Sequence, residues 1–542
     1  MPRIFPRVAF VVSLPCALLL SACRREPSFS PTAVPAGGPA DGDAYVSASL
    51  GDASHLNPVL ATDSASNEIV GLVFNGLVKY DKNLHIAGDL AESFETLRGG
   101  REIIFRLRPG LRWQDGLPVT SDDVRFTFEK LTDPSVRTPF SADYARVDRL
   151  ETPDPLTIRV FYKEPFAPAL ESWTRGIIPR HVYGTGDFNG HPANRRPIGT
   201  GPYIFVEWKS DEKIILKANP DYWEGKPHIS RYIFRVIPDA AVQFLELRNE
   251  SVDTVSLTPD QYKAYDVFFR SYNKFRYPSF SYTYLGFNLN RPLFKDRRVR
   301  EAIACALNKQ EIIDGVLLGM GAPATGPFPP QSWAYDPGVK DFAYDPERAK
   351  ALLAEAGWTA SKGDGVLYKD GRPFAFTVVT NQGNKLREMT AVILQSHLAA
   401  IGIKMNIRII EWSSFLHNFI DPGNFDATIL GWSTGIDPDQ YVIWHSSQRG
   451  PGKYNFVGYA NPEADRLLEE GRREFDPARR RDIYRRLHRI LHDDLPYLFL
   501  YYPESLPVVH KRFVGVETAP IGIGWNFNTW YVPKTRQKYA VQ

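Results

Sequence analysis

The alternation of apolar and polar positions along the chain first predicts β-strands. Residues 45–50 alternate between the two kinds, as expected for a strand with one buried face. A second strand is expected over 403–410. The pair Gly99-Gly100 separates the short segments 93–97 and 103–107, and this arrangement is typical of a β-hairpin.

Helices are indicated by their start and stop signals as well as by their spacing. Ser121 is followed by two aspartates, which favour a helix start through capping and the helix dipole. Asp345-Pro346 opens another helix and Gly357 closes it, which is the usual placement of proline and glycine. The remaining expected helices are 63–74, capped by Asp63 or Ser64, then 385–400, 461–473 and 477–492.

These elements alternate without the strict strand–helix repeat of a barrel, and no internal repeat is visible. The chain has 542 residues, which is too long for one core. The pattern therefore predicts an α/β protein of two lobes that the chain crosses more than once.

Composition and charge narrow the class of partner. The formal net charge is +3, and residues 1–22 contribute Arg3 and Arg7 without an acid, so that the remainder is nearly neutral. No basic face suited to a phosphate backbone is evident, which argues against nucleic acid as a partner. A dense basic run is interpreted as the solvated face of a helix. It comprises Arg479, Arg480, Arg481, Arg485, Arg486 and Arg489.

Aromatic residues are numerous, with 26 Tyr, 33 Phe and 11 Trp. They fit large cores, and they fit equally an aromatic-walled cleft, because Tyr and Trp combine a broad contact area with a polar group. Composition does not distinguish these alternatives.

The N-terminus has the features of an export signal. Two arginines precede the mostly apolar segment 8–20, which is too short to span a bilayer. Leu20-Ser21-Ala22-Cys23 then resembles a bacterial lipoprotein signal, which implies cleavage before Cys23 and acylation of its thiol, palmitate included. An ordinary secretory signal or a short anchor helix are the alternatives. We expect residues 1–22 to be a signal peptide and Cys23 to hold a membrane anchor, since each buried CH₂ adds ~0.8 kcal/mol.

Residues 23–43 are rich in proline and glycine and predict a flexible tether with a reach of roughly 25 Å. No later segment is apolar enough to span a bilayer. Besides Cys16 in the signal and Cys23, the chain has only Cys305, which fits a small core residue of a helix. The mature chain therefore has no disulfide framework.

A search for catalytic and metal motifs finds no HExxH, GxSxG, GxxxxGK or CxxC. His488 and His492 lie four apart on an expected helix and have a spacing that zinc accepts, but a solvated helix end is the preferred interpretation. We expect no enzyme activity, no metal and no cofactor.

Several ordered segments together resemble the peptide/nickel-type extracellular solute-binding proteins of ABC importers, the family of dipeptide- and oligopeptide-binding proteins. They span about 44–530. The segments are Gly199-Thr200-Gly201-Pro202-Tyr203, Asn219-Pro220-Asp221-Tyr222-Trp223, Tyr284-Leu285-Gly286-Phe287-Asn288, the run from Pro292 to Ala302, Asn308-Lys309, the run from Tyr344 to Leu353, Gly431-Trp432 and Asp437-Pro438-Asp439.

The resemblance implies a two-lobed periplasmic-binding-protein fold of type II, the peptide-binding class, which closes over its ligand. It places lobe one at 44–286 plus 503–542, with a subdomain near 83–195, and lobe two at 287–502. The two crossings are expected near Gly286-Phe287-Asn288 and Leu500-Tyr501-Tyr502.

It also implies ligand residues. Peptide binders of this family hold an extended backbone like an added strand, and residues 424–439 would form part of this wall. Trp432 and Ser433 would lie beside the ligand, although core packing is the alternative for Trp432. The family's Asp that pairs with the peptide α-amine falls at Gly435 here; Asp437 or Asp439 would replace it, or the ligand has no fixed free amine. Further candidates are His55 and Asn57 in one loop and Asn384, Lys385 and Arg387 in another, where a cation would take a carboxylate.

The resemblance finally implies partners: a peptide ligand, a permease of two membrane subunits with ATPases, and a membrane through the lipid on Cys23. We expect a monomer in the cell envelope, periplasmic or outer-face. The alternatives are the same fold with a nickel chelate, haem, oligosaccharide or antibiotic as cargo, an envelope hydrolase, or a peptide-sensing receptor.

Overall fold

The computed structural model describes residues 38–264, 268–360, 363–450 and 452–539. The predicted signal peptide, Cys23 and most of the predicted tether lie outside these ranges. The tether's expected end at residue 43 is two residues late, because Gly42 already pairs with Ile229 as the first residue of strand β1.

A four-stranded sheet has the order β1-β10-β9-β8. The pair β1–β10 is parallel, and the other two pairs are antiparallel. The strands are β1 (Gly42–Ser49), β8 (Tyr203–Lys209), β9 (Lys213–Ala218) and β10 (Ile229–Val236).

A second, antiparallel sheet lies inside the range expected for the subdomain and has the order β4-β5-β7-β6. Its hairpin β4–β5 turns at Gly99-Gly100 as predicted, with both glycines at positive φ. The strands are β4 (Ala91–Leu97), β5 (Glu102–Leu107), β6 (Val147–Asp154) and β7 (Thr157–Tyr162).

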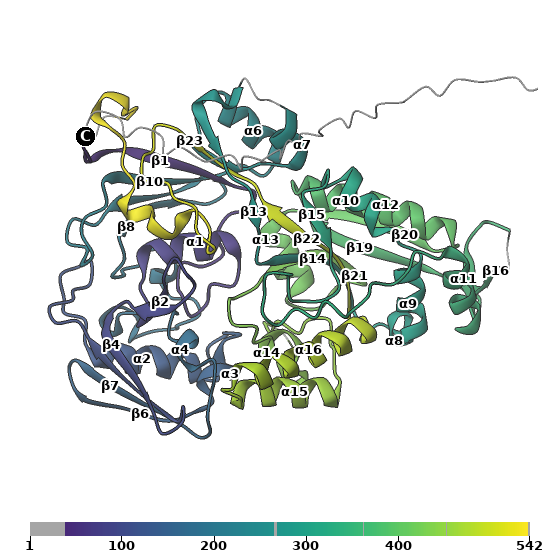
Figure 1. Ribbon diagram of the computed structural model, residues 1–542, viewed down its shortest axis with the longest axis horizontal. Coiled ribbons are helices and arrows are strands. Elements are labelled where there is room, and N and C mark those ends of the chain that lie inside the picture. The colour runs from purple at the N-terminus through teal and green to yellow at the C-terminus, as the bar shows by residue number, and fades with distance from the viewer. Residues whose placement is uncertain (1–37, 265–267, 361–362, 451, 540–542) are drawn as a thin grey trace, which may run out of the picture. The chain divides into compact units, whose positions relative to one another are not determined.

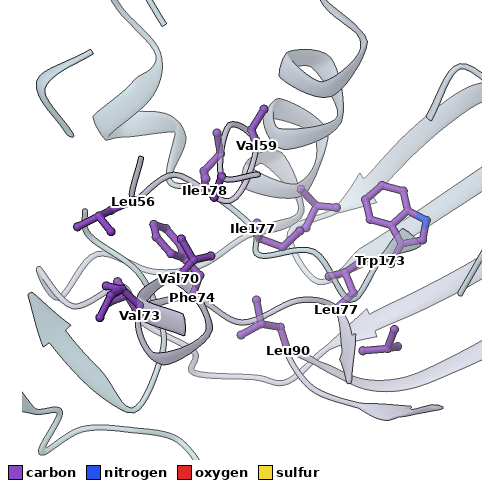
Figure 2. Packing of buried hydrophobic residues seen from close by; sticks show 14 of the residues in the cluster. Leu56, Val59, Val70, Val73, Phe74, Leu77, Leu90, Trp173, Ile177 and Ile178 are labelled. Carbon is purple, nitrogen blue, oxygen red and sulfur yellow. The ribbon is translucent and has the colours of Figure 1, made fainter. Parts of the chain in front are cut away.

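One hydrophobic cluster joins these two sheets. It includes Phe105 and Ile158 from the second sheet and Ile214 and Phe234 from the first. Figure 2 shows part of it, where Val70, Val73 and Phe74 lie together and Leu77 lies nearer to Trp173. The expected subdomain therefore shares its core with the rest of the predicted lobe one.

The two glycines of the Gly199-Thr200-Gly201 segment are explained by its close approach to the end of helix α1. A Cβ at Gly199 would lie 1.9 Å from the Val73 carbonyl oxygen, and the Gly201 N–H donates to that oxygen at 2.8 Å. Only glycine lets this turn approach helix α1 so closely.

A seven-stranded sheet has the order β13-β22-β14-β21-β19-β20, with β15 paired to β22 (Figure 1). Strands β19–β20 and β19–β21 are parallel, and the other pairs are antiparallel. The strands are β13 (Tyr277–Pro278), β14 (Ser281–Phe287), β15 (Gly321–Pro323), β19 (Ala375–Asn381), β20 (Lys404–Ile410), β21 (Ala427–Ser433) and β22 (Tyr497–Ser505).

Both faces of this sheet are buried. On β14, Leu285 and Phe287 join one cluster with helices α9, α11 and α12. Tyr282 and Tyr284 point to the other face and join a second cluster with α14, α15 and α16. This alternation follows from the two-residue period of a strand.

The structure contains sixteen α-helical segments across its described residues. They are α1 (Ser64–Val73), α2 (Ser121–Thr132), α3 (Ser141–Tyr144), α4 (Ala169–Ser172), α5 (Arg180–Tyr183), α6 (Ala240–Arg248), α7 (Pro259–Ala264), α8 (Pro292–Lys295), α9 (Arg297–Cys305), α10 (Lys309–Gly315), α11 (Pro346–Glu355), α12 (Lys385–Ala400), α13 (Trp412–Phe415), α14 (Tyr441–Trp444), α15 (Pro462–Arg473) and α16 (Pro477–Asp494).

Three small sheets complete the described secondary structure, with strand orders β11-β23-β12, β2-β3 and β16-β17-β18. Their strands are β2 (Val78–Tyr80), β3 (Ile86–Gly88), β11 (Thr254–Ser256), β12 (Tyr272–Lys274), β16 (Thr359–Ala360), β17 (Leu367–Lys369), β18 (Arg372–Pro373) and β23 (Pro507–His510).

The predicted helices are present, and most caps are confirmed. Asp63 caps α1 by accepting from the Ser66 N–H, and Asp345 caps α11 before Pro346. The start of α2 differs slightly, because Thr120 rather than Ser121 is its capping residue. Cys305 ends α9 and is buried, as expected of a core residue.

The interpretation of the basic run as a solvated helix face holds for Arg479, Arg481, Arg486 and Arg489, which are exposed, but is wrong for Arg480, which is buried. Arg480, Tyr484, Leu487 and His488 repeat at helical spacing and are buried. His492 is also buried and stacks on Phe342 at 4.6 Å between ring centroids, so these histidines are not a solvated helix end.

The lobe boundaries stay predictions, and the strand pairing refines where we place them. Residues 281–286, expected in lobe one, pair with β21 and β22 in the seven-stranded sheet. We therefore propose that the crossings lie before Ser281 and after Ser505 rather than at Gly286 and Tyr502.

Across the described ranges, no helix combines the length and the apolar character needed to cross a membrane.

Candidate functional site

A large cavity of about 1750 Å³ is lined by segments from both predicted lobes. The 132–143 and 168–175 segments contribute from predicted lobe one, and the 430–443 segment from predicted lobe two. The volume exceeds the roughly 300–1,000 Å³ typical of small-molecule sites.

Strand β21 and the loop after it form one wall. β21 pairs with β14 along its whole length, but with β19 only at Ala427 and Thr428. On that side, residues 429–433 have no strand partner within the described part of the chain. Leu430 to Gly435 line the cavity, so this wall presents an unpaired strand edge beside it.

Two ion pairs hold the loop that follows. Asp437 binds Arg480 of α16 through both carboxylate oxygens, at 2.5 and 2.7 Å. Asp439 accepts from Arg472 of α15 at 2.7 and 2.9 Å. Both carboxylates line the cavity, yet both are already bound by an arginine.

Arg472 also reaches the other side of the cavity. Its Nη2 donates to Asp143 of α3 at 2.5 Å, and its side chain is only 2% exposed. Nearby, Arg146 pairs with Glu469 of α15 at 2.6 Å. These bridges join the 141–146 segment to α15 along the rim of the cavity.

Glu171, in the short helix α4, is a lining residue that the sequence did not single out. Its Oε2 atom is buried, and no hydrogen-bond partner for it exists among the described residues. Burial, and next the charge of Asp437, raise the pKa of this carboxyl well above its usual range. Nothing in its sequence context distinguishes it from other glutamates.

Of the candidates in the 384–387 loop, two line the cavity and one does not. Arg387 lines the cavity and donates to Asn381 Oδ1 at 2.7 Å, and burial lowers the pKa of its guanidinium. Asn384 also lines the cavity, but its side chain caps α12 by accepting from the Arg387 N–H at 3.1 Å. Lys385 is exposed, pairs with Glu388 at 2.9 Å and is not among the lining residues.

Of the two candidates in the 55–57 loop, one lines the cavity and the other does not. His55 lines the cavity, and burial lowers the pKa of its ring. Asn57 is fully buried and is not a lining residue. Its side chain caps a turn by accepting from the Val59 N–H and donates to Asn194 at 2.9 Å, which explains why an asparagine stands there.

Trp432 combines both roles that the sequence suggested. It lines the cavity, and its ring also packs on Tyr454 and Phe456 at 5.0 and 6.1 Å between centroids. Its indole N–H donates to the Tyr497 hydroxyl at 3.3 Å. Ser433 and Gly435 are exposed lining residues. Contact of any of these residues with a ligand stays a prediction.

No three His, Cys, Asp or Glu side chains gather into a group that could hold a metal ion in the ranges that the structure covers.

Comparison with known proteins decides the family. Residues 85–453 match the model of the bacterial extracellular solute-binding proteins, family 5. The chain belongs to this family. Its fold is the two-lobed fold of the peptide-binding class, as the resemblance implied.

The relatives of this family 5 protein cover nearly its whole length. It is 35% identical over 533 residues to the oligopeptide-binding protein AppA of Bacillus subtilis (strain 168), covering 96% of this chain and 97% of AppA. The structure of AppA in complex with a nonapeptide has a TM-score of 0.88 at 34% identity and covers 92% of this chain and all of that one.

A second solved structure of the family type differs in cargo. NikZ of Campylobacter jejuni, in complex with Ni(L-His), has a TM-score of 0.83 at 28% identity and covers 90% of this chain and 99% of that one. Membership therefore gives the family 5 protein a solute-binding role outside the cytoplasm, and leaves the solute to be argued from its own cavity.

Proposed function

We propose that this chain is the substrate-binding lipoprotein of an ABC importer, and that it captures oligopeptides between two lobes and delivers them to a membrane permease. The observation that supports peptide cargo is the unpaired edge of β21 over residues 430–433, which lies at the cavity wall. An extended peptide binds such an edge through its main chain, which gives affinity without demanding a side-chain sequence.

The size and composition of the cavity support the same cargo. Its volume of about 1750 Å³ accommodates a chain of several residues. The Glu171 carboxyl, whose Oε2 atom has no donor, and the half-buried Arg387 offer an acidic and a basic side chain to the ends or side chains of a peptide. Trp432, Tyr454 and Phe456 offer apolar surface to varied side chains. The likeness to AppA, solved with a nonapeptide, supports an oligopeptide rather than a dipeptide.

The remaining parts of the proposal concern the protein's setting. It is anchored through lipid on Cys23, works as a monomer in the periplasm or on the outer face of the envelope, and docks on a permease of two membrane subunits with ATPases. It catalyses no reaction, and its ligand leaves the cavity chemically unchanged.

Thermal unfolding of the intact chain tests the cargo. Four probes are added separately: an equimolar mixture of synthetic nonapeptides, a malto-oligosaccharide, nickel–histidine and haem. A mixture of free amino acids is the control. We expect a rise in Tm with the nonapeptides alone, because a ligand at 100 times its Kd adds about 2.7 kcal/mol of stability. A rise with one of the non-peptide probes and none with the nonapeptides contradicts the proposal.

A further inference from the structure

Glu171 occupies one end of the strand edge that the proposed peptide would follow. A Cβ at Gly435, two residues beyond β21, would lie 2.8 Å from Glu171 Oε1. The carboxyl group therefore reaches from α4 across to the backbone at the end of this wall. A chain laid along residues 430–433 meets Glu171 near that end.

The neighbouring acids are already neutralised, and Glu171 is not. Asp437 is bound by Arg480 and Asp439 by Arg472. The Tyr80 hydroxyl hydrogen-bonds the Glu171 carboxyl. The described residues nevertheless supply no cationic partner within ion-pair distance and no donor to its buried Oε2 atom. A buried acceptor without a donor destabilises the fold, so a ligand that supplies a donor gains affinity.

We propose that Glu171 is a specificity-determining residue that accepts an ammonium group of the ligand, namely the amino terminus of a bound peptide. This proposal rests on the proposed function. An ammonium has three donors and a positive charge, so it satisfies Oε2 and neutralises the carboxylate together. Gly435 has no side chain, and this leaves room for the amino terminus of the peptide to reach the Glu171 carboxyl group.

Binding of an ammonium by Glu171 is linked to the protonation of its carboxyl group. Four charged or titratable groups face Glu171: Tyr80 of β2, Asp437 and Asp439 of the loop after β21, and Arg480 of α16. Burial and the two aspartates raise the Glu171 pKa, whereas Tyr80 and Arg480 offset this in part. A ligand ammonium favours the ionised carboxylate and so lowers the Glu171 pKa. Between the pKa values of the free and the bound protein, binding releases a proton and affinity increases with pH.

The test compares two libraries on three forms of the intact chain. The libraries are an equimolar mixture of lysine-free synthetic nonapeptides with free amino termini and the same mixture N-acetylated. The forms are wild type, Glu171→Gln, and the control Glu347→Gln. Glu347 lies on α11 with its side chain 81% exposed, so the control makes the same chemical change far from the cavity. Affinity and proton release are measured by titration calorimetry in buffers of different ionisation enthalpy.

We expect acetylation to weaken binding to wild type at least tenfold, which needs no variant to observe. Glu171→Gln should lose at least tenfold for the free library, change less than threefold for the acetylated one, and release no proton. Glu347→Gln should match wild type. A Glu171→Gln protein that binds the free library as wild type does, or a wild type indifferent to acetylation, overturns the role of Glu171 and leaves peptide binding intact. Failure of wild type to bind either library overturns the proposed function, and this inference with it.

Discussion

At the scale of single residues, the cavity wall is held by charges that come from distant parts of the sequence. Arg472 joins Asp439, 33 residues before it, to Asp143, which lies 329 residues away. His488 is fully buried in the core beside Thr325 and Asp336.

Replacement of Arg472 should destabilise the protein far more than replacement of an exposed arginine. Arg472→Met leaves two acids at the cavity without their cation, and losing one partner of a buried pair costs about 3–5 kcal/mol. Arg479→Met is the control, because Arg479 is 69% exposed and its pair with Glu474 is worth about 0.2–1 kcal/mol. Urea unfolding of both variants measures the difference. Equal losses of unfolding free energy in the two variants would contradict a stabilising role for the buried ion pairs of Arg472.

His488 should make stability depend on pH. Burial lowers its pKa to about 4, from about 6.5 in the unfolded chain. Since the folded pKa is depressed, its contribution is present above pH 6.5 and is lost as pH falls toward 4. Between pH 7.5 and 4.5, wild type should lose about 2 kcal/mol more than His488→Gln, measured by urea unfolding at both values. Parallel losses in the two proteins would show that His488 already titrates normally in the fold.

At the scale of elements, the proposed peptide pairs with the strand edge of β21. Its residues beyond Thr428 lose their β19 partner, while β14 keeps it fixed on the other side. The Ile429 carbonyl accepts from the Thr380 hydroxyl at 2.9 Å, and beyond it the main-chain groups on this side have no β19 partner, so they can pair with a ligand.

Pairing with this edge predicts a period of two along the bound peptide. If each amide of a binding nonapeptide is N-methylated in turn, affinity should fall about tenfold at alternate positions and little between them, because successive amides of a strand point to opposite sides. Competition binding with the methylated series measures this, and the unmethylated peptide is the control. A flat profile would mean that side chains rather than the backbone hold the ligand.

The sequence predicted most of these elements because local signals define them. The helix over 385–400 and the hairpin at Gly99-Gly100 are present with the predicted bounds or turn. The order of the sheets, by contrast, depends on pairing between segments hundreds of residues apart, which local patterns do not report. The strand pairing is therefore what leads us to propose lobe two rather than lobe one for residues 281–286. Of the candidate site residues, Asn57 and Lys385 were not recognised as a turn cap and a surface ion pair. Glu171 was missed because its unpartnered state exists only in three dimensions.

At the scale of the whole molecule, salt bridges cross the rim of the cavity from residues 143–164 to α15. Asp143, Arg146 and Glu164 all contribute to them. We propose that these contacts belong to a closed form of the two predicted lobes, which a ligand stabilises only if it touches both sides.

Peptide binding should therefore make the protein more compact, and weakening the rim should oppose this. X-ray scattering should show a smaller radius of gyration when a binding nonapeptide is added to wild type. Arg146→Gln removes the 2.6 Å bridge to Glu469 and should weaken peptide affinity about three- to tenfold. Arg149→Gln is the control, since Arg149 is 52% exposed and pairs within its own segment. Unchanged scattering at saturating peptide would argue against closure.

Native mass spectrometry of the intact chain, purified from cells without refolding, identifies the cargo without any choice of ligand beforehand. We expect a ladder of co-purified masses that fragment into short peptides of mixed sequence, with free amino termini. A single non-peptide mass, such as a nickel chelate or a sugar, would contradict peptide capture while leaving the family and the fold in place.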